Sequence, residues 1–461
     1  MVHCFKYNHK GRDFHFLWDV ESGSLHNVDA VAYLVAKNKY DKLSATEMQK
    51  FAQIPCDVVQ EIQAEFAQVE EAGGLNTPAY AKAQDKQIGE IKALCLHICH
   101  DCNLRCKYCF ADEGTYHSKC KEYMSFEVGK KAIDFLIANS GKRHNLEVDF
   151  FGGEPLMNLD VVKQIVDYAR VKGNDAGKTF NFTLTTNCLL LDDETIDWLN
   201  KEMYNVVLSI DGREQVHDRL RRTANDKGSQ AIVLQKAKKF AEKRGDKSYY
   251  VRGTFTAYNL DFANDILYLR DQGFEQISIE PVVLPEDSPM ALRQEHLPQI
   301  MAEYERLAEE YLQSRATGKW FNFFHFMMSL EDGPCIKKRL TGCGAGCEYL
   351  AITPYGDIYP CHQFAGDSKY KLGNVMQDEF SLEISKLFAK NVVTNKPQCE
   401  NCPAKYYCSG GCAANNIHFA GDISKPYSIS CEMMKKRFEL SLAISAIEQA
   451  GTQEWSWFYA F

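Results

Sequence analysis

Three closely spaced cysteines are the residues of this chain best suited to do chemistry. Cys102, Cys106 and Cys109 form a C-x3-C-x2-C pattern. A structural zinc site closes four ligands around the ion, whereas an iron–sulfur cubane held by three cysteines keeps one iron free for another ligand. The spacing therefore predicts an iron–sulfur cluster with an open iron, held by these three cysteines.

A second set of cysteines lies toward the other end of the chain. It consists of a C-x2-C-x5-C-x3-C run and the cysteines that flank it: Cys343, Cys347, Cys361, Cys399, Cys402, Cys408, Cys412 and Cys431. Paired C-x2-C units also build tetrahedral zinc sites, so zinc stays an alternative for this set. The chain has 18 cysteines, and cytosolic thiols are normally kept reduced rather than paired. The clustered cysteines are therefore expected to bind metal.

The other cysteines are expected to be ordinary residues. Cys4, Cys56, Cys120 and Cys188 stand apart from both sets and are predicted to be small buried hydrophobes. The same interpretation is preferred for the cysteines next to the two sets, which are Cys95, Cys99 and Cys335.

Composition limits the partners that the chain can have. Its 461 residues suggest two to four domains at roughly 150 residues each. Hydrophobic residues make up 45%, which is enough for real cores, and the net charge of −9 gives no electrostatic reason to bind nucleic acid or an anionic membrane. The sequence shows neither a secretory signal nor an apolar run of about 18 residues. We therefore expect a cytoplasmic protein without nucleic-acid or membrane partners.

Short apolar runs alternate with amphipathic stretches between residues 92 and 315. Strands are expected at 94–98, 146–151, 180–185, 205–210, 249–256 and 276–283. Helices, with apolar residues three and four apart, are expected near 125–139, 158–172, 192–202, 229–244, 260–272 and 292–314. Repeated strand–helix units imply an α/β fold in which a parallel sheet curls into a partial (β/α)6 barrel.

Polar groups follow the first four of these strands. In barrels of this kind the active site lies at the carboxyl ends of the strands. The three-cysteine run follows the first strand. The groups after the next three strands are Gly152-Gly153-Glu154-Pro155, Thr186-Asn187, and Ser209 with Asp211-Gly212. Because the carboxyl ends of parallel strands meet on one face, these groups are expected to converge. A plain turn stays an alternative for Asp211-Gly212.

Outside the barrel the chain divides into smaller segments. Residues 1–75 predict a separate module with a hairpin at 14–28 and helices near 29–37, 46–53 and 56–71. Residues 76–91 are expected to be a linker, 316–440 a glycine- and cysteine-rich region held together by bound clusters, and 441–461 a C-terminal helix with an aromatic tail.

The cysteine run with Tyr108 before its last cysteine resembles the signature of radical S-adenosylmethionine (SAM) enzymes, and the GGEP run resembles the second motif of that family. The resemblance implies that the open iron chelates the methionine moiety of SAM. It assigns Gly152, Gly153 and Glu154 to the methionine ammonium and Tyr108 to the adenine. Further candidates are Asn187, Ser209 and Asp211 for the ribose and Arg221 for the methionine carboxylate.

The C-terminal cysteines resemble the SPASM extension of radical peptide maturases, which implies two auxiliary clusters and three [4Fe-4S] clusters in all. By that resemblance an outer cluster uses Cys399, Cys402, Cys408 and Cys431, and an inner one uses Cys343, Cys361 and Cys412. Cys347 is either a fourth ligand of the inner cluster or leaves it with an open iron, which is the form we favour.

Residues 1–75 are similar in element order to winged-helix leader-recognition modules, which add a peptide as a strand to a sheet edge. Further motifs are Cys95-Leu96-His97-Ile98, Gly342-Cys343-Gly344-Ala345-Gly346 and Pro360-Cys361-His362-Gln363-Phe364. Through these motifs, the chain taken whole resembles maturases of SCIFF peptides, a family that joins cysteine sulfur to carbon within a cysteine-rich precursor. The resemblance implies a radical SAM oxidoreductase with a leader-bearing precursor peptide and a flavodoxin- or ferredoxin-like electron donor as partners. SAM cleavage would give a 5′-deoxyadenosyl radical that removes hydrogen from carbon, after which a thiolate closes the thioether.

Two other functions stay open. One is a sulfatase maturase that forms formylglycine. The resemblance to those enzymes is incomplete, because they have an acidic residue directly after the cysteine that corresponds to Cys361, whereas this chain has His362 there. The other is a non-catalytic electron-transfer protein with several clusters, which needs no nucleotide pocket.

Overall fold

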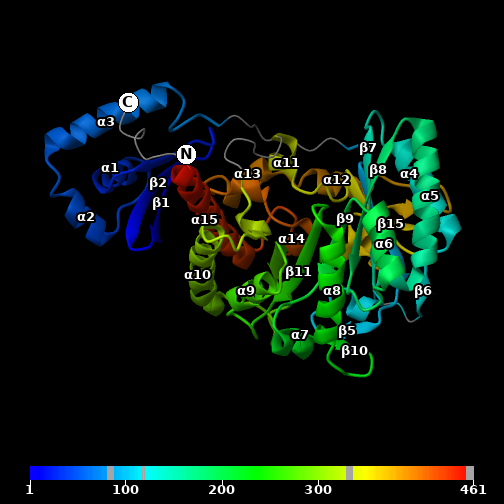
Figure 1. Cartoon of the computed structure of the whole chain (residues 1–461). Helices are drawn as coiled ribbons and strands as arrows, with labels where there is room; N and C mark the ends of the chain where they lie inside the picture. The colour runs from blue at the N-terminus through cyan, green and yellow to red at the C-terminus, as the bar shows by residue number, and fades with distance from the viewer. Residues whose placement is uncertain (80–87, 117, 119, 329–335, 453–461) are drawn as a thin grey trace.

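The computed structural model describes residues 1–79, 88–116, 118, 120–328 and 336–452. A small N-terminal sheet with helices, a curved central sheet flanked by helices, and a C-terminal region follow one another along the chain (Figure 1). Parts of the predicted linker and tail, residues 80–87 and 453–461, lie outside the described residues, as does Cys335. No helix in the described ranges is both long and apolar enough to cross a membrane.

The six strands predicted for the central region are all present. Each pairs in parallel with the next. In one of them Leu146, Val148 and Phe150 are fully buried and alternate with more exposed residues, which is the pattern that a half-buried strand requires. The strands are β4 (Ala93–His100), β7 (Asn145–Gly152), β8 (Thr179–Thr186), β9 (Asn205–Ser209), β11 (Tyr249–Phe255) and β12 (Gln276–Pro281).

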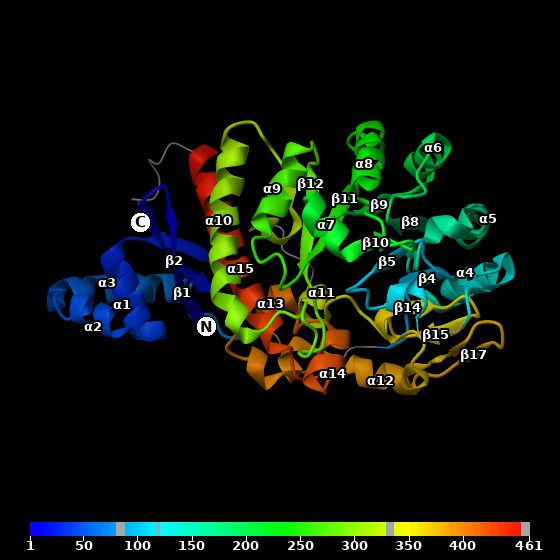
Figure 2. The same cartoon turned by 90° about the horizontal axis from the view of Figure 1, so that it is seen from below.

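The six predicted helices are present as well, and they cover the outer side of the curved sheet (Figure 2). They are α4 (Phe126–Asn139), α5 (Leu159–Ala176), α6 (Asp193–Glu202), α8 (Gln230–Arg244), α9 (Ala263–Asp271) and α10 (Leu297–Ala316). Their apolar stripes pack against the buried side chains of the strands. The predicted α/β architecture is therefore confirmed.

Several short elements of this region were not predicted. The most important is an antiparallel pair in which β5 (Leu104–Cys106) lies beside β10 (Arg221–Thr223). The others are β6 (Glu122–Tyr123), which pairs with β4, and α7 (Glu214–Leu220). Elements of two to seven residues are too short to leave a periodic pattern in the sequence.

The N-terminal sheet has three strands rather than the predicted hairpin. β2 (Arg12–Asp19) and β3 (Leu25–Val28) form that hairpin, and β1 (Val2–His9) pairs with the other edge of β2. The strand was missed because its two faces are both buried, so apolar residues do not alternate with polar ones. The predicted helices follow as α1 (Ala30–Tyr40), α2 (Ala45–Phe51) and α3 (Cys56–Glu71).

One face of this N-terminal sheet packs into the main core of the protein. Trp18 is 1% exposed, its indole Nε1 donates to the carbonyl of Pro403 at 3.3 Å, and its ring meets Phe438 edge-on at 5.5 Å. The buried Glu21 accepts from Tyr406 Oη at 2.7 Å. Residues 1–75 are thus docked against the C-terminal helices, which Figure 2 shows beside β1 and β2.

The C-terminal region continues the central sheet instead of forming a sheet of its own. β14 (Tyr349–Ile352) pairs in parallel with β4, and β13 (Asn322–Phe323) pairs with β12 at the other edge. The remaining elements are β15 (Asp357–Tyr359), β16 (Gly373–Asn374), β17 (Glu379–Phe380), α11 (Ile336–Thr341), α12 (Glu383–Ala389), α13 (Lys405–Cys408), α14 (Ala413–Ala420) and α15 (Ser428–Thr452). The last helix starts earlier than predicted and carries Cys431.

The isolated cysteines differ in their surroundings. Cys4 and Cys188 are buried as predicted. Cys56 and Cys120 are exposed, so that prediction is wrong for these two. Cys56 opens α3 on the outer side of the N-terminal module, and Cys120 lies in a surface turn, where neither can be covered by a core.

Candidate iron–sulfur and SAM site

The loop after β4 brings the three predicted cluster cysteines together. The antiparallel pairing of β5 with β10 sets Cys106 opposite Arg221, and the Cys109 amide donates to the Cys106 carbonyl at 3.0 Å. Burial raises the pKa of the Cys102 thiol, and the charges of Glu154, Cys106 and Cys109 act in the same direction. The three thiols are thus neighbours in this loop.

The glycines of the GGEP run serve the packing of this loop. A Cβ on Gly153 would lie 1.9 Å from the carbonyl oxygen of Asp101, and one on Gly152 would lie 2.3 Å from that of Cys99. The Gly153 amide also donates to the Cys99 carbonyl at 2.8 Å. The space without side chains is therefore filled by the cluster loop itself.

Glu154 joins the loops that follow the second and third strands. It is 1% exposed, and its carboxylate accepts from Thr186 Oγ1 at 2.8 Å and from the Asn187 amide at 2.7 Å. Burial raises the pKa of Glu154 to about 7, although these hydrogen bonds oppose the shift. The predicted convergence of the two loops is confirmed.

Asn187 is turned toward the cluster loop. Its Nδ2 donates to Asn103 Oδ1 at 2.6 Å and approaches Cys102 Sγ at 3.6 Å, while its Oδ1 accepts from the Leu189 amide at 3.1 Å. The half-buried Ser209, at the end of β9, makes no side-chain hydrogen bond to the described residues. Of these two of the three ribose candidates, Ser209 therefore keeps its hydroxyl available, and Asn187 helps to hold the loop.

Asp211 is bonded within the protein on both carboxylate oxygens. The fully buried carboxylate accepts from Tyr108 Oη at 2.9 and 2.7 Å, from Arg221 Nε at 3.0 Å and from the Thr254 amide at 3.0 Å. The Arg221 guanidinium lies 5.5 Å from the centroid of the Tyr108 ring. The structure thus gives Asp211 a positioning role for two other SAM-site candidates, in addition to any contact with the ribose.

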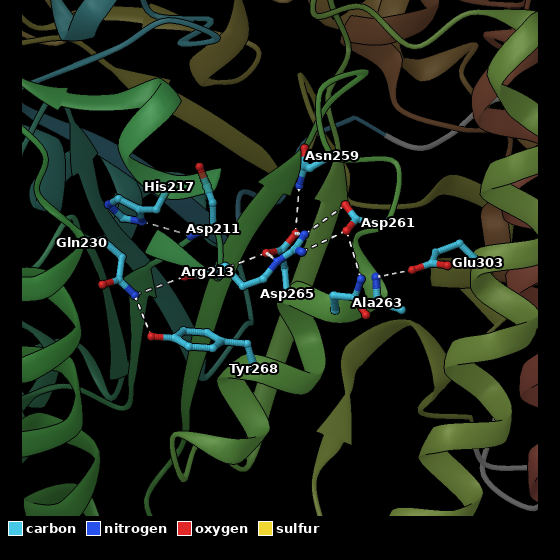
Figure 3. A network of polar contacts seen from close by, with 12 residues as sticks. Asp211, Arg213, His217, Gln230, Asn259, Asp261, Ala263, Asp265, Tyr268 and Glu303 are labelled. Carbon is cyan, nitrogen blue, oxygen red and sulfur yellow. Dashed lines mark hydrogen bonds and ion pairs between the residues drawn. The ribbon is translucent and has the colours of Figure 1, made fainter. Parts of the chain in front are cut away.

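A polar network behind Asp211 fixes its turn (Figure 3). Arg213 binds Asp265 through Nε at 2.8 Å and Asp261 through Nη2 at 2.9 Å, and Asn259 Nδ2 donates to Asp265 at 3.1 Å. A Cβ on Gly212 would lie 2.7 Å from Asp265 Oδ1. The turn is therefore held from α9 and from the loop before it, which the sequence did not reveal because these residues are far from Arg213 along the chain.

The outer set of C-terminal cysteines lines one cavity of about 240 Å³, whose wall includes Cys399, Cys402, Cys408 and Cys431. Burial raises the pKa of Cys431 to about 12, and the neighbouring thiols of Cys408, Cys399 and Cys402 add to the shift. Among the described residues, no three His, Cys, Asp or Glu side chains converge on a point where they could hold a single ion. Thiols spaced around a cavity fit a polynuclear cluster better than the zinc alternative.

The cysteines of the inner set also influence one another. Burial raises the pKa of Cys361, and the charges of Cys412 and Cys343 act in the same direction. The thiol of Cys347 is buried and donates to the Ser385 carbonyl at 3.6 Å. Cys343, Cys361 and Cys412 are thus brought together.

An aromatic contact that the sequence did not reveal joins the cluster loop to the inner set. The centroid of the His362 ring lies 5.2 Å from the ring centroids of Phe110 and Phe151. Phe110 directly follows the last cluster cysteine, and Phe151 is the second-last residue of β7. Burial, and then the Arg252 guanidinium, lower the pKa of His362 to about 4. The imidazole next to Cys361 is therefore neutral at pH 7.

Comparisons with known proteins agree with this geometry. A model of the 4Fe-4S single cluster domain matches residues 91–234, and a model of the SPASM iron–sulfur cluster-binding domain matches residues 343–403. The chain is 26% identical over 75% of its length to the radical SAM cyclopropyl synthase TigE of Paramaledivibacter caminithermalis, covering 73% of that protein. The chain is a radical SAM enzyme with a SPASM domain.

Other relatives of this radical SAM enzyme are known by sequence and by structure. A cysteine-type anaerobic sulfatase-maturating enzyme of Clostridium novyi is 24% identical over 74% of the chain and 93% of its own length. The solved structure of anSMEcpe with bound AdoMet and Kp18Cys peptide has a TM-score of 0.64 at 20% identity, over 78% of this chain and 99% of that one. The likeness to anSMEcpe shows a shared fold. The two matched domain models support SAM and [4Fe-4S] clusters as the cofactors of the radical SAM enzyme, with auxiliary clusters in the SPASM domain.

Replacing Asp211 by asparagine should weaken SAM binding by about tenfold or more. A hydrogen bond to a charged group contributes about 1.5–3 kcal/mol, and about 1.4 kcal/mol is tenfold in affinity. The change would loosen Tyr108 and Arg221 together. Equilibrium binding of SAM to the reconstituted enzyme measures this, with Asp226→Asn as a control, since the Asp226 side chain is 81% exposed. Equal affinity of Asp211→Asn and the parent would show that the positioning role is wrong.

Proposed function

We propose that this radical SAM enzyme is a maturase that joins a cysteine sulfur to a carbon of another residue in a ribosomally made, cysteine-rich precursor peptide, as SCIFF maturases do. Relatives support a peptide substrate. One is the antilisterial bacteriocin subtilosin biosynthesis protein AlbA of Bacillus subtilis, 26% identical over 70% of this chain and 67% of its own length. Another is Streptococcus suis SuiB, solved bound to precursor peptide SuiA, with a TM-score of 0.50 over 90% of this chain.

The open edge of the N-terminal sheet supports the proposal that the substrate has a leader. The sheet order β1–β2–β3 leaves β3 with a strand on one side only, and α1 to α3 pack on the face opposite the docked one. An unpaired strand edge is a template for an added peptide strand. Residues 1–75 would therefore capture the leader, while the barrel acts on the core of the precursor.

The residues of the barrel have separable tasks in this proposal. Cys102, Cys106 and Cys109 would hold the catalytic cluster, and Tyr108, Glu154 and Arg221 would bind SAM. When bound, the cluster and SAM supply a 5′-deoxyadenosyl radical. Asp211 holds Tyr108 and Arg221 in place, and Glu154 locks the two loops that face the cluster loop.

Thioether formation removes one hydrogen atom from a carbon and one proton from a thiol, and it releases a second electron. The inner set of cysteines would provide the site that accepts this electron, because Cys361 is joined to the cluster loop through His362, Phe110 and Phe151. A small flavodoxin- or ferredoxin-like protein would deliver the electron that is needed for cleavage of SAM.

Formylglycine formation is the second candidate, because the anSMEcpe structure shares the fold over most of this chain. Treatment of a cysteine-rich precursor with reduced enzyme and SAM separates the two. A thioether product loses two hydrogen atoms and keeps every sulfur, whereas formylglycine made from cysteine lacks one sulfur. High-resolution mass spectrometry after thiol alkylation reports both changes. A product that lacks sulfur would replace our proposal with the second candidate.

Replacing Cys347 by alanine should leave iron content and crosslinking at parental levels, since the Cys347 thiol is directed to the Ser385 carbonyl. An iron without a cysteine ligand is then open to another ligand. Iron analysis and the crosslinking assay measure the two properties, and Cys361→Ala serves as the matched variant that should lose the inner cluster. Loss of iron in Cys347→Ala would assign this cysteine as the fourth ligand.

A further inference from the structure

A single lysine lies buried between the two sets of C-terminal cysteines. Lys396 is 2% exposed, and its Nζ donates to the Gly410 carbonyl at 2.6 Å. Gly410 belongs to the C-x3-C segment that runs from Cys408 of the outer set to Cys412 of the inner set. The ammonium is therefore held against the stretch of chain that links the two sets.

The packing leaves little freedom for this ammonium. A Cβ on Gly410 would lie 3.1 Å from Lys396 Nζ and 2.9 Å from its Cδ, so the lysine fills the space beside that glycine. Asn416 Nδ2 donates to the same Gly410 carbonyl at 3.1 Å and fixes its orientation. An ammonium has three donors, and among the described residues only the Gly410 carbonyl accepts from it.

Lys396 lacks the carboxylate partner that nearby lysines have. Lys435 pairs with Glu432 at 2.9 Å and Lys405 with Glu21 at 2.6 Å. Within the described ranges no carboxylate oxygen lies within 4.0 Å of Lys396 Nζ.

Cysteines of both sets are the main anionic groups that act on Lys396, and the exposed Asp422 interacts with it more weakly. Burial lowers the pKa of Lys396, and the charges of Cys399, Cys408, Cys431 and Cys412 oppose this shift. A buried charge is costly unless an opposite charge compensates it. An iron–sulfur cluster with thiolate ligands carries net negative charge and can supply that compensation.

We propose that Lys396 is a positioning residue for electron transfer, a counter-charge shared by the two auxiliary clusters that raises the reduction potential of both. The proposal rests on the ligand sets proposed above. Adding an electron makes a cluster more negative, so a nearby ammonium stabilises its reduced form, and cluster potentials follow net charge and hydrogen bonding. Because one cation serves both clusters, it favours acceptance of the substrate electron at the inner cluster without trapping it there.

Potentiometric titration of the reconstituted enzyme, followed by electron paramagnetic resonance, tests this proposal without any peptide. Lys396→Met removes the charge and the hydrogen bond, Lys396→Gln removes the charge and keeps a donor for Gly410, and Lys396→Arg keeps the charge. We expect lower midpoint potentials for both auxiliary clusters in the Met and Gln variants, parental values in the Arg variant, and an unchanged catalytic cluster in all three. Lys435→Met, which removes an ammonium already paired with Glu432, is the matched control and should leave the inner cluster unchanged.

The remaining outcomes also decide the matter. Parental potentials in Lys396→Gln would show that the hydrogen bond matters and the charge does not, which would overturn the proposal. If the Met and Gln variants lose the auxiliary clusters while Arg keeps them, the requirement for charge is supported. Loss of the clusters in all three variants would show a requirement for side-chain shape and would also overturn it. Because the assay needs no precursor, its failure is distinct from failure of the proposed crosslinking.

Discussion

An enzyme in which Cys102, Cys106 and Cys109 are all replaced by alanine should form no 5′-deoxyadenosine. These thiols lie together in the loop after β4, where burial raises the pKa of Cys106 to about 12. A cluster binds the deprotonated thiolates, and the loop from Asp101 to Phe110 holds no other cysteine that could replace them. The variant should contain about four irons fewer per chain, as expected for one missing [4Fe-4S] cluster.

Iron analysis and chromatography of the SAM cleavage products measure the two effects. The auxiliary clusters should survive, because their proposed ligands lie in the C-terminal region and none of them is replaced. A double variant of the exposed Cys56 and Cys120 is a matched control and should keep both iron and activity. Formation of 5′-deoxyadenosine by the triple variant would mean that the catalytic cluster is elsewhere.

Replacing Asn27 by proline should weaken precursor binding by about tenfold or more while SAM cleavage without peptide persists. Asn27 is an exposed residue of the edge strand β3. Proline lacks the N–H and obstructs an added strand, and each hydrogen bond lost is worth about 0.5–1.5 kcal/mol against about 1.4 kcal/mol per tenfold in affinity. Fluorescence anisotropy with a labelled precursor measures the affinity.

Hydrogen exchange supplies the control for this variant. In the parent enzyme, precursor should slow amide exchange in β3, and thermal unfolding should show that Asn27→Pro remains folded. Normal binding by a folded Asn27→Pro variant, with no protection of β3 in the parent, would assign the N-terminal sheet a role other than leader capture.

Deleting residues 1–75 is a less informative test than the sequence suggested. We expected a separate module that could be removed without affecting the barrel. Phe16 and Trp18 are buried in the main core, and Trp18 Nε1 is bonded to Pro403. A truncated chain would expose this apolar surface, so lost activity could reflect lost stability.

The helices and strands in which apolar residues recur at regular spacing were predictable. Each central strand either alternates buried and exposed residues or forms an apolar run, and each barrel helix has an apolar stripe. β1 was missed because Phe5 faces the main core while Val2 and Cys4 face the helices of the N-terminal module, which removes the alternation. β5 and β10 were missed because three residues give no pattern.

The site could be predicted only where its residues are neighbours in sequence. The cysteine spacing and the GGEP run identified the loop that contains Cys102 and Glu154. The packing role of Gly153 could not be predicted, because only coordinates show that the Asp101 carbonyl fills the space beside it. The partners of Arg213 and the burial of Lys396 depend on residues far away along the chain, and no local spacing indicates them.

The most direct test of the central claim follows a deuterium atom. A cysteine-rich precursor with deuterated carbons in its other residues is incubated with reduced enzyme and SAM. We predict deuterium in the 5′-deoxyadenosine and, in equal amount, a peptide that has lost one thiol and gained one sulfur–carbon bond. Crosslinked peptide formed together with deuterium-free 5′-deoxyadenosine, or 5′-deoxyadenosine formed with no change in the peptide, would contradict the account.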